Sequence, residues 1–318
     1  MRVRIETGAR LHFGFYMLMP VHRIWGGIGM GVDGIGYEIV MEEASSESIR
    51  GCQAYRFHRL LEEARARLKL SGLQVRLEAR RCIPEHRGLG STTQAALAVY
   101  TGLARLAGLD IDVYRLAEIA GRGRVSGVGV AVFAEGGFIV DTGKRVGDEI
   151  SVPKPLVRYP MPGEWSIVYI IPRTTWRVSE EEEQVFQGSI SYEKQCNLLE
   201  TVFTRLLPSI LERDFATFTE ALEELDTIMG EYFAKSQGGR RYCCPESEMV
   251  AQLVREEGGR GVGQSSWGPL IYAFYPSEEE AREALNRVVA RLEERGVRLE
   301  AYGVLRPRNR GALVVVEG

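Results

Sequence analysis

Lysine and histidine are scarce in this 318-residue chain, and long apolar runs are absent. Only 5 lysines accompany 35 arginines, and the net charge of −3 leaves no positive excess for a nucleic-acid partner. No run of about 18 apolar residues occurs, and the first residues, "MRVRIETGARLHF", lack the apolar core of a signal peptide. We therefore expect no nucleic-acid partner, no membrane span and a cytoplasmic location.

Cysteine is also infrequent, and its five occurrences form no CxxC pair and no Cys/His spacing of a zinc site. An odd number of cysteines does not suit a disulfide framework. We therefore expect all five to be buried thiols in a reducing cytosol. These residues are Cys52, Cys82, Cys196, Cys243 and Cys244.

Hydrophobic periodicity divides the chain into two α+β units. In the first half, strands are predicted over 3–15 and 35–43 with a glycine-rich loop between them, and an amphipathic helix over 53–70. Four prolines between positions 153 and 162 favour a domain boundary there, giving domains 1–160 and 161–318. Because helices and strands segregate, a TIM barrel or Rossmann sheet is disfavoured.

The remaining elements are predicted from the same patterns. Strands are expected over 73–80, 165–172, 269–276, 297–304 and 312–317, and helices over 112–120, 192–207, 215–229, 246–256 and 277–295.

A glycine turn joins a strand to an alanine-rich helix in "IPEHRGLGSTTQAALAVYTGLARL", residues 83–106. Gly88 and Gly90 allow a tight turn and a close approach to a ligand. Ser91 and Thr92, with Thr93, lie where the helix begins, and there they offer an N-cap and free N–H groups. A capped helix alone would need one hydroxyl, so the pattern favours a phosphate site.

Other glycine-rich and acidic patterns give weaker evidence for a binding site. The Walker pattern GxxxxGK[ST] is absent. "GMGVDG", residues 29–34, matches GxGxxG, but no helical pattern follows, so we interpret the match as accidental. "SEEEEQVF", residues 179–186, suits the solvated start of a helix, where glutamates complement the dipole.

Three segments resemble motifs of the GHMP kinase superfamily. "PEHRGLGST" (84–92) is similar to its PxxxGLGSS motif, while "TGARLHFGF" (7–15) and "GRGVGQSSWGP" (259–269) stand where its first and third motifs lie. The resemblance covers nearly the whole chain. It implies an α+β fold of two domains, an N-terminal phosphate-loop domain and a ferredoxin-like C-terminal domain, with a site between them.

Position 129 departs from the kinase pattern. Mevalonate-kinase-like members carry SGxD, whose aspartate is the catalytic base, whereas this chain reads "VSGVG" and has Gly129 there. Loss of a general base lowers rates by about 10²–10⁴-fold, so kinase chemistry of that type is disfavoured.

One branch of the superfamily is a closer match. "RLHFGF", "RIWGGIGMGVD", "GRGRVSGVGVAVFAEGGFIVDTG" and "GVGQSSWGP" resemble the archaeal β-ribofuranosylaminobenzene 5′-phosphate synthase family. That resemblance implies a transferase of methanopterin biosynthesis. Phosphoribosyl pyrophosphate would condense with 4-hydroxybenzoate or 4-aminobenzoate, with release of pyrophosphate and CO2.

The resemblance assigns roles to the glycine turn and to the loop before residue 129. The turn at Gly88, Gly90, Ser91 and Thr92 is expected to hold the departing diphosphate, with Mg²⁺ on the same oxygens and the Ser91 or Thr92 hydroxyl touching the metal. A further loop would clamp the 5′-phosphate through its two arginines, which could equally be solvated. This loop contains Arg122, Arg124, Ser126 and Gly127.

Two further groups are candidates for the aromatic acid. Arg10 and His12 lie on one face of a strand, so one could bind the carboxylate while the other exchanges a proton, unless both merely satisfy backbone carbonyls. A glycine-flanked loop could stack on the ring, or be only a structural turn. It contains Gln264, Ser265, Ser266 and Trp267.

Several alternatives stay open. Asp141 and Glu135 could bind Mg²⁺ or act as a base, but an acid closing a short strand is more often a turn former. A small-molecule ATP kinase with another base, or a catalytically silent sugar-phosphate sensor, would share these motifs. The sequence does not choose between the hydroxy and amino acids, and a homodimer is compatible with the family.

Overall fold

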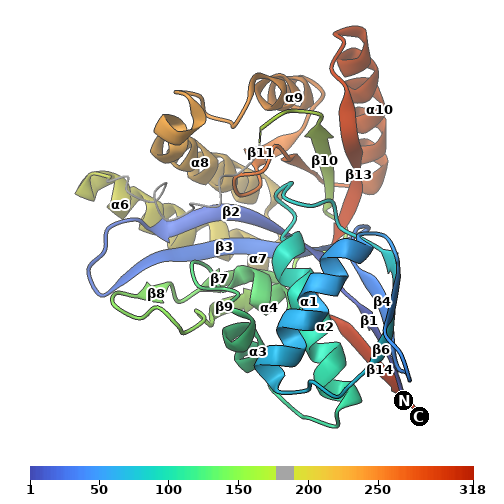
Figure 1. Cartoon of the computed structure of the whole chain (residues 1–318). Helices are drawn as coiled ribbons and strands as arrows, with labels where there is room; N and C mark the ends of the chain where they lie inside the picture. The colour runs from blue at the N-terminus through green and yellow to red at the C-terminus, as the bar shows by residue number, and fades with distance from the viewer. Residues whose placement is uncertain (177–189) are drawn as a thin grey trace.

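The computed structural model describes residues 1–176 and 190–318 (Figure 1). The predicted helix start at 179–186 lies outside these residues. Helices are α1 (Ala54–Leu68), α2 (Ser91–Leu106), α3 (Val113–Ala120), α4 (Val128–Ala134), α6 (Tyr192–Glu200), α7 (Leu207–Glu212), α8 (Phe215–Phe233), α9 (Pro245–Glu256) and α10 (Glu278–Glu294), with a π-helical turn η1 (Thr201–Leu206) and a 3₁₀ turn η2 (Ala234–Gln237).

Helices and strands occur in separate runs in both halves of the described chain. They are β1 (Arg2–Glu6), β2 (Ala9–Met17), β3 (Arg23–Asp33), β4 (Glu38–Glu43), β5 (Ser48–Gly51), β6 (Val75–Arg81), β7 (Phe138–Asp141), β8 (Lys144–Arg145), β9 (Pro155–Tyr159), β10 (Ser166–Pro172), β11 (Arg260–Gln264), β12 (Ile271–Tyr275), β13 (Leu299–Pro307) and β14 (Leu313–Glu317).

Two sheets organise the described residues. One has the strand order β14-β1-β4-β6-β5, and the other has β11-β12-β10-β13-β3-β7-β9 with β2 and β8 paired to β3. Strand β13 pairs with β10 at one end and with β3 at the other, and β14 pairs with β1. The end of the chain therefore returns to its beginning, and the two termini lie close together in Figure 1.

Helix α2 is the central helix of the N-terminal half. Thirteen of its sixteen residues are buried, because its alanines let α1, α3, α4 and β1 pack closely around it. This packing fixes the direction of the helix and therefore the position of its N-terminus, where the glycine turn lies.

The segment predicted as a glycine-rich loop is instead strand β3. Its glycines permit close packing: a Cβ at residue 29 would overlap the Leu11 carbonyl oxygen of β2. Glycine usually weakens a strand, but here the tertiary neighbours require it. Residues 29–33 of "GMGVDG" lie in this strand, and the next element is strand β4 rather than a helix, which confirms that the match to GxGxxG is accidental.

Three elements have no counterpart among the predicted helices and strands. The apolar run after the arginine loop is helix α4, the proline-rich segment contains β9, and the third glycine motif begins with β11. The helix predicted over 192–207 continues to residue 212 through the π-helical turn. Within the described residues, no helix has the length and apolarity to cross a membrane.

The cysteine prediction was wrong for three of the five residues. Cys52 and Cys82 form a disulfide, and Cys196 is exposed, whereas Cys243 and Cys244 are buried free thiols. Parallel strands β5 and β6 explain the pairing, because Cys52 and Cys82 directly follow their C-terminal ends. Sequence spacing carries no sign of this register.

Removal of the disulfide should destabilise the fold. The bond joins residues 30 positions apart, and closing a loop of this size restricts the unfolded chain by roughly 3 kcal/mol. A chain with both Cys52→Ser and Cys82→Ser should lose about that free energy of unfolding in urea without reductant. Cys196→Ser is the matched control and should be neutral; equal stability of all three chains would contradict the prediction.

Candidate functional site

The glycine turn leaves the N-terminus of α2 available to an anion. Gly90 is the N-cap residue, with φ of 70°, and no side chain of the described residues caps the helix. The predicted hydroxyl cap is therefore wrong: Ser91 is the first helical residue and is buried, and Thr92 is half-buried. Because no side chain accepts from the first N–H groups, the positive end of the helix dipole can face a ligand.

Three segments far apart in the sequence meet at this turn. The Arg10 N–H of β2 donates to the Leu89 carbonyl at 3.0 Å, and the Ser265 hydroxyl donates to the Gly88 carbonyl at 2.6 Å. The His12 N–H donates to Ser265 Oγ at 3.0 Å. Strand β2, the glycine turn and the loop after β11 therefore form one hydrogen-bonded unit.

Gly88→Ala should disrupt this unit. Gly88 has φ of 90°, and a Cβ there would overlap the carbonyl oxygen of Ser265. We expect a free energy of unfolding lower by roughly 1–3 kcal/mol and an apparent KM for a substrate held at the turn raised about tenfold. Gly72→Ala is the control, because nothing lies within 4 Å of a Cβ at that position. Unchanged kinetics in Gly88→Ala would remove the turn from the site.

Ser126 links His12 to a buried carboxylate. His12 Nε2 lies 3.2 Å from Ser126 Oγ, and the Ser126 hydroxyl donates to Asp141 Oδ2 at 2.9 Å. These residues come from β2, the loop before α4 and the end of β7. The fold therefore assembles a His–Ser–Asp chain that no local motif contains.

The hydrogen bonds assign the tautomer of His12. With Asp141 ionised, the single hydroxyl proton of Ser126 goes to Asp141, so the Nε2–H of His12 donates to Ser126 and Nδ1 is left as an acceptor. Burial, with a smaller contribution from the positive charge of Arg10, holds the pKa of His12 well below 6.5. The ring is therefore neutral near pH 7.

Asp141 is fully buried and organises the surrounding loops. Its Oδ1 accepts from the N–H groups of Gly27 and Gly143, and its Oδ2 from that of Gly127, each at 2.8 Å. Burial raises the pKa of Asp141, whereas these donors favour the carboxylate. A Cβ at residue 27 would overlap Ser126 Oγ, so glycine is needed there.

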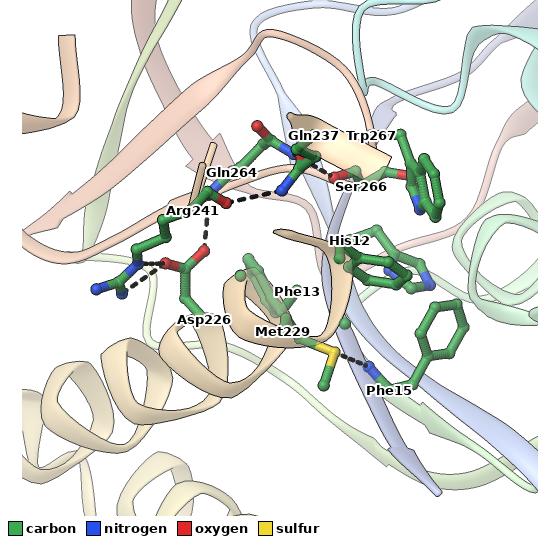
Figure 2. Close-up of a pocket in the computed structure, with 13 residues that line it drawn as sticks. His12, Phe13, Phe15, Asp226, Met229, Gln237, Arg241, Gln264, Ser266 and Trp267 are labelled. Carbon is green, nitrogen blue, oxygen red and sulfur yellow. Dashed lines mark hydrogen bonds and ion pairs between the residues drawn. The ribbon is translucent and has the colours of Figure 1, made fainter. Parts of the chain in front are cut away.

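An aromatic pocket lies beside His12 (Figure 2). The His12 ring meets Phe15 edge-on at 4.9 Å between centroids, and Phe233 meets Trp267 at 4.6 Å. Most of the remaining wall comes from β2, α8 and the segments around η2 and β11. It is formed by Phe13, Gly14, Asp226, Met229, Gly230, Gln237, Arg241, Gln264 and Ser266.

Asp226 of α8 anchors the polar side of this pocket. Its Oδ2 accepts from Arg241 Nε and Nη2 at 3.0 and 2.7 Å, and its Oδ1 accepts from the Gln264 N–H at 3.0 Å. The Gln264 amide in turn donates to Gln237 Oε1 at 2.9 Å and to the Ser266 carbonyl at 3.0 Å. The loop bearing Trp267 is therefore held against α8.

The structure separates the two candidate arginines from this pocket. Arg122 is half-buried among Glu63, Arg56 and Arg67 of α1, and Arg124 is exposed. Among the described residues that line the pocket, neither arginine occurs. Their role toward the 5′-phosphate stays a prediction, although Ser126 and Gly127 of the same loop do lie at Asp141.

The residues at the turn offer little to a metal ion of their own. Ser91 and Thr92 supply hydroxyls, but the described residues contain no group of three His, Cys, Asp or Glu side chains that could hold an ion. Glu135 accepts from the Tyr114 hydroxyl at 2.9 Å. Hydroxyls fit a Mg²⁺ that is held mainly by substrate phosphates and water.

Several functional candidates escape sequence reasoning. Asp226, Met229 and Phe233 lie on a helix whose periodicity predicts only core packing, while Gln237 and Arg241 follow it in a polar segment. The one available signal was Asp226, an acid on an otherwise apolar helix face. The importance of Asp141 was underestimated, because a strand-closing acid usually forms only a turn.

Comparison with known proteins agrees with this geometry. The family model described as "GHMP kinases N terminal domain" matches residues 54–137, and the one described as "GHMP kinases C terminal" matches residues 206–294. The structure resembles homoserine kinase from Cytophaga hutchinsonii, with a TM-score of 0.71 at 17% identity over 99% of this chain and 97% of that one. Mevalonate diphosphate decarboxylase from Staphylococcus aureus gives a TM-score of 0.66 at 14% identity over 99% and 98%. These likenesses establish the fold.

Sequence relatives refine the assignment. The chain is 29% identical to the β-ribofuranosylphenol 5′-phosphate synthase of Methanothermobacter thermautotrophicus, over 98% of both chains. It is also 29% identical to the protein of that name from Archaeoglobus fulgidus, over 99% of this chain and all of the relative. The chain therefore belongs to the GHMP kinase superfamily and, within it, is similar over its whole length to enzymes named β-ribofuranosylphenol 5′-phosphate synthase.

Proposed function

We propose that this enzyme is a decarboxylating phosphoribosyltransferase of the cytoplasm, acting in methanopterin-type cofactor biosynthesis. It joins phosphoribosyl pyrophosphate to a para-substituted benzoate and releases CO2 and pyrophosphate. The observation that carries the proposal is the neutral His12, held by Ser126 and Asp141 beside an aromatic pocket and next to the uncapped N-terminus of α2.

The relatives support 4-hydroxybenzoate over 4-aminobenzoate. Their name, β-ribofuranosylphenol 5′-phosphate synthase, describes a product that carries a phenol. A phenol results when the acid that loses its carboxylate bears a para hydroxyl group. Aromatic side chains of the pocket, including Phe15, Phe233 and Trp267, are of the kind that contact a planar ring, although the cavity of about 20 Å³ must widen to admit one.

In the proposed reaction His12 accepts the para hydroxyl proton. The ring carbon that bears the carboxylate bonds to C1 of the ribose as the diphosphate leaves, and loss of the phenolic proton to Nδ1 gives a neutral cyclohexadienone. The bond to the carboxylate then breaks, its electron pair restores the aromatic ring, and CO2 leaves. His12 returns the proton to the phenolate.

The N-terminus of α2 stabilises the leaving group. Free N–H groups at Ser91 and Thr92 face the site where negative charge increases as the diphosphate departs. A bound Mg²⁺ would neutralise part of that charge, with the two hydroxyls as its protein contacts.

The test is release of labelled CO2. Purified protein is incubated with Mg²⁺, phosphoribosyl pyrophosphate and carboxyl-labelled 4-hydroxybenzoate or 4-aminobenzoate. We expect release that requires both substrates and is faster with the hydroxy acid. 3-Hydroxybenzoate is the matched control, because a meta hydroxyl cannot donate electrons to the carbon that bears the carboxylate.

Two results would redirect the assignment. Absence of release with either acid, in a protein that transfers phosphate from ATP to an alcohol, would support a kinase. Binding of phosphoribosyl pyrophosphate without any product would support a sensor. Gly129 argues against a kinase, because it has no side chain that could act as a base. Its backbone carbonyl accepts a hydrogen bond from Gln94 Nε2 at 2.8 Å.

A further inference from the structure

Two cysteines adjacent in sequence, Cys243 and Cys244, pack against the loop that carries Trp267. The Cys243 and Cys244 sulfurs are 3.5 Å apart and buried, with 1% and 5% of each residue exposed. Both thiols are free, and neither belongs to the proposed reaction. They therefore form a dithiol whose chemistry the function leaves unexplained.

The surroundings of the pair favour a reactive sulfur at Cys244. This residue is the N-cap of α9, where the helix dipole stabilises negative charge. The hydrogen bond from the Cys243 thiol, with a further bond from the Ser247 backbone N–H, lowers the pKa of Cys244 to about 6, although burial opposes this effect. The same contact raises the pKa of Cys243, so Cys244 is the sulfur of the pair that loses its proton more readily.

The pair is connected to the pocket by short hydrogen bonds. The Cys243 N–H donates to Gln264 Oε1 at 2.7 Å, and Gln264 lines the pocket. Ser247 Oγ lies 3.6 and 3.2 Å from the two sulfurs and donates to the Pro269 carbonyl at 2.9 Å. One end of the 264–269 loop therefore contacts Cys243, and the other end is linked to both sulfurs through Ser247.

We propose that Cys243 and Cys244 are a reversible oxidation site, which closes to a vicinal disulfide and thereby loosens the 264–269 loop. With a peroxide as oxidant, the Cys244 thiolate attacks one oxygen and forms a sulfenic acid with release of water. The Cys243 sulfur then attacks the sulfenyl sulfur, a second water leaves, and the S–S bond forms. Two thiols are oxidised and one peroxide is reduced to two waters.

Ring closure must move the backbone. The sulfurs approach from 3.5 Å to a bonding distance of about 2.0 Å within an eight-membered ring that contains the Cys243–Cys244 peptide. Cys244 now has extended dihedral angles, with φ of −154° and ψ of 160°. The dihedral changes that close the ring also displace the Cys243 backbone. The Cys243 N–H, which belongs to the preceding Tyr242–Cys243 peptide, then loses its bond to Gln264 Oε1, and one restraint on the pocket wall is released.

Peptide mass spectrometry tests the chemistry without reference to catalysis. The full chain with Cys196→Ser is treated with hydrogen peroxide, alkylated and digested with trypsin. Peptide 242–255 contains both sulfurs and no other cysteine, while Cys52 and Cys82 fall in 51–56 and 82–87. We expect peptide 242–255 to lose two hydrogens, to resist alkylation, and to recover both thiols in dithiothreitol.

Hydrogen exchange tests the coupling to the loop. In the Cys196→Ser chain, amides of residues 264–266 should exchange about tenfold faster after peroxide treatment. In chains that also carry Cys243→Ser or Cys244→Ser, peroxide should leave these exchange rates unchanged. Sulfinic or sulfonic acid in place of the disulfide, or a dithiol that stays reduced while Cys196 in the unmodified chain oxidises, would overturn the proposal. A disulfide that leaves loop exchange unchanged would overturn its coupling to the pocket.

Discussion

His12→Asn should lower kcat by about 10²–10⁴-fold and change the KM for the aromatic acid by much less. Asparagine keeps a polar side chain of similar reach, but its amide cannot accept the phenolic proton. His58→Asn is the matched control, because His58 is exposed and lies on α1. Steady-state kinetics of CO2 release measures both constants, and equal kcat in both variants would remove His12 from the chemistry.

The same substitution should flatten the pH dependence of stability. Burial holds the pKa of His12 well below 6.5, so below that pH the unfolded chain binds a proton that the folded chain does not. In the wild type, the contribution of His12 to the free energy of unfolding is complete above pH 6.5. It is lost as the pH falls toward the pKa of His12 in the folded protein, by about 1.4 kcal/mol per pH unit. Urea denaturation at about pH 7.5 and 5.5 should show this loss in wild type and not in His12→Asn. Parallel losses would mean that His12 is protonated in the folded protein.

Asp141→Asn should inactivate the enzyme by reversing the hydrogen bonds of the chain. The amide oxygen of the new asparagine accepts from the Gly27 and Gly143 N–H groups, and its NH₂ group donates to Ser126 Oγ. The Ser126 hydroxyl then donates its own proton to His12 Nε2. That arrangement requires the proton of His12 on Nδ1, so the acceptor is lost. In Ser–His–Asp triads the corresponding change lowers kcat by about 10⁴-fold, and we expect about 10²–10⁴-fold here.

Nitrogen NMR separates this effect from simple unfolding. In Asp141→Asn the Nε2–H tautomer of His12 should be replaced by the Nδ1–H tautomer, and the free energy of unfolding should fall by about 1–3 kcal/mol, because the Gly127 N–H loses its acceptor. Asp148→Asn is the control, since Asp148 also accepts from backbone N–H groups but lies in an exposed turn. An inactive Asp141→Asn with the original tautomer would refute the mechanism of inactivation.

Local patterns predicted most helices because periodicity and caps are sequence-local signals. The helices at 53–70, 112–120 and 277–295 are found within a few residues, as α1, α3 and α10. Strand β3 could not be predicted in this way, because its glycines suit close neighbours that only the tertiary structure supplies. The Cys52–Cys82 bond likewise depends on parallel pairing of β5 with β6.

The sequence by itself determined the α+β class, the superfamily, the glycine turn before α2 and the candidates Arg10 and His12, because each lies within one short segment. Tertiary structure alone decided that His12 meets Ser126 and Asp141, 114 and 129 positions away, and that α8 closes the aromatic pocket. It also set Arg122 and Arg124 apart from that pocket. The physical reason is that burial, tautomer and hydrogen-bond partners are properties of packed neighbours, which residue spacing does not encode.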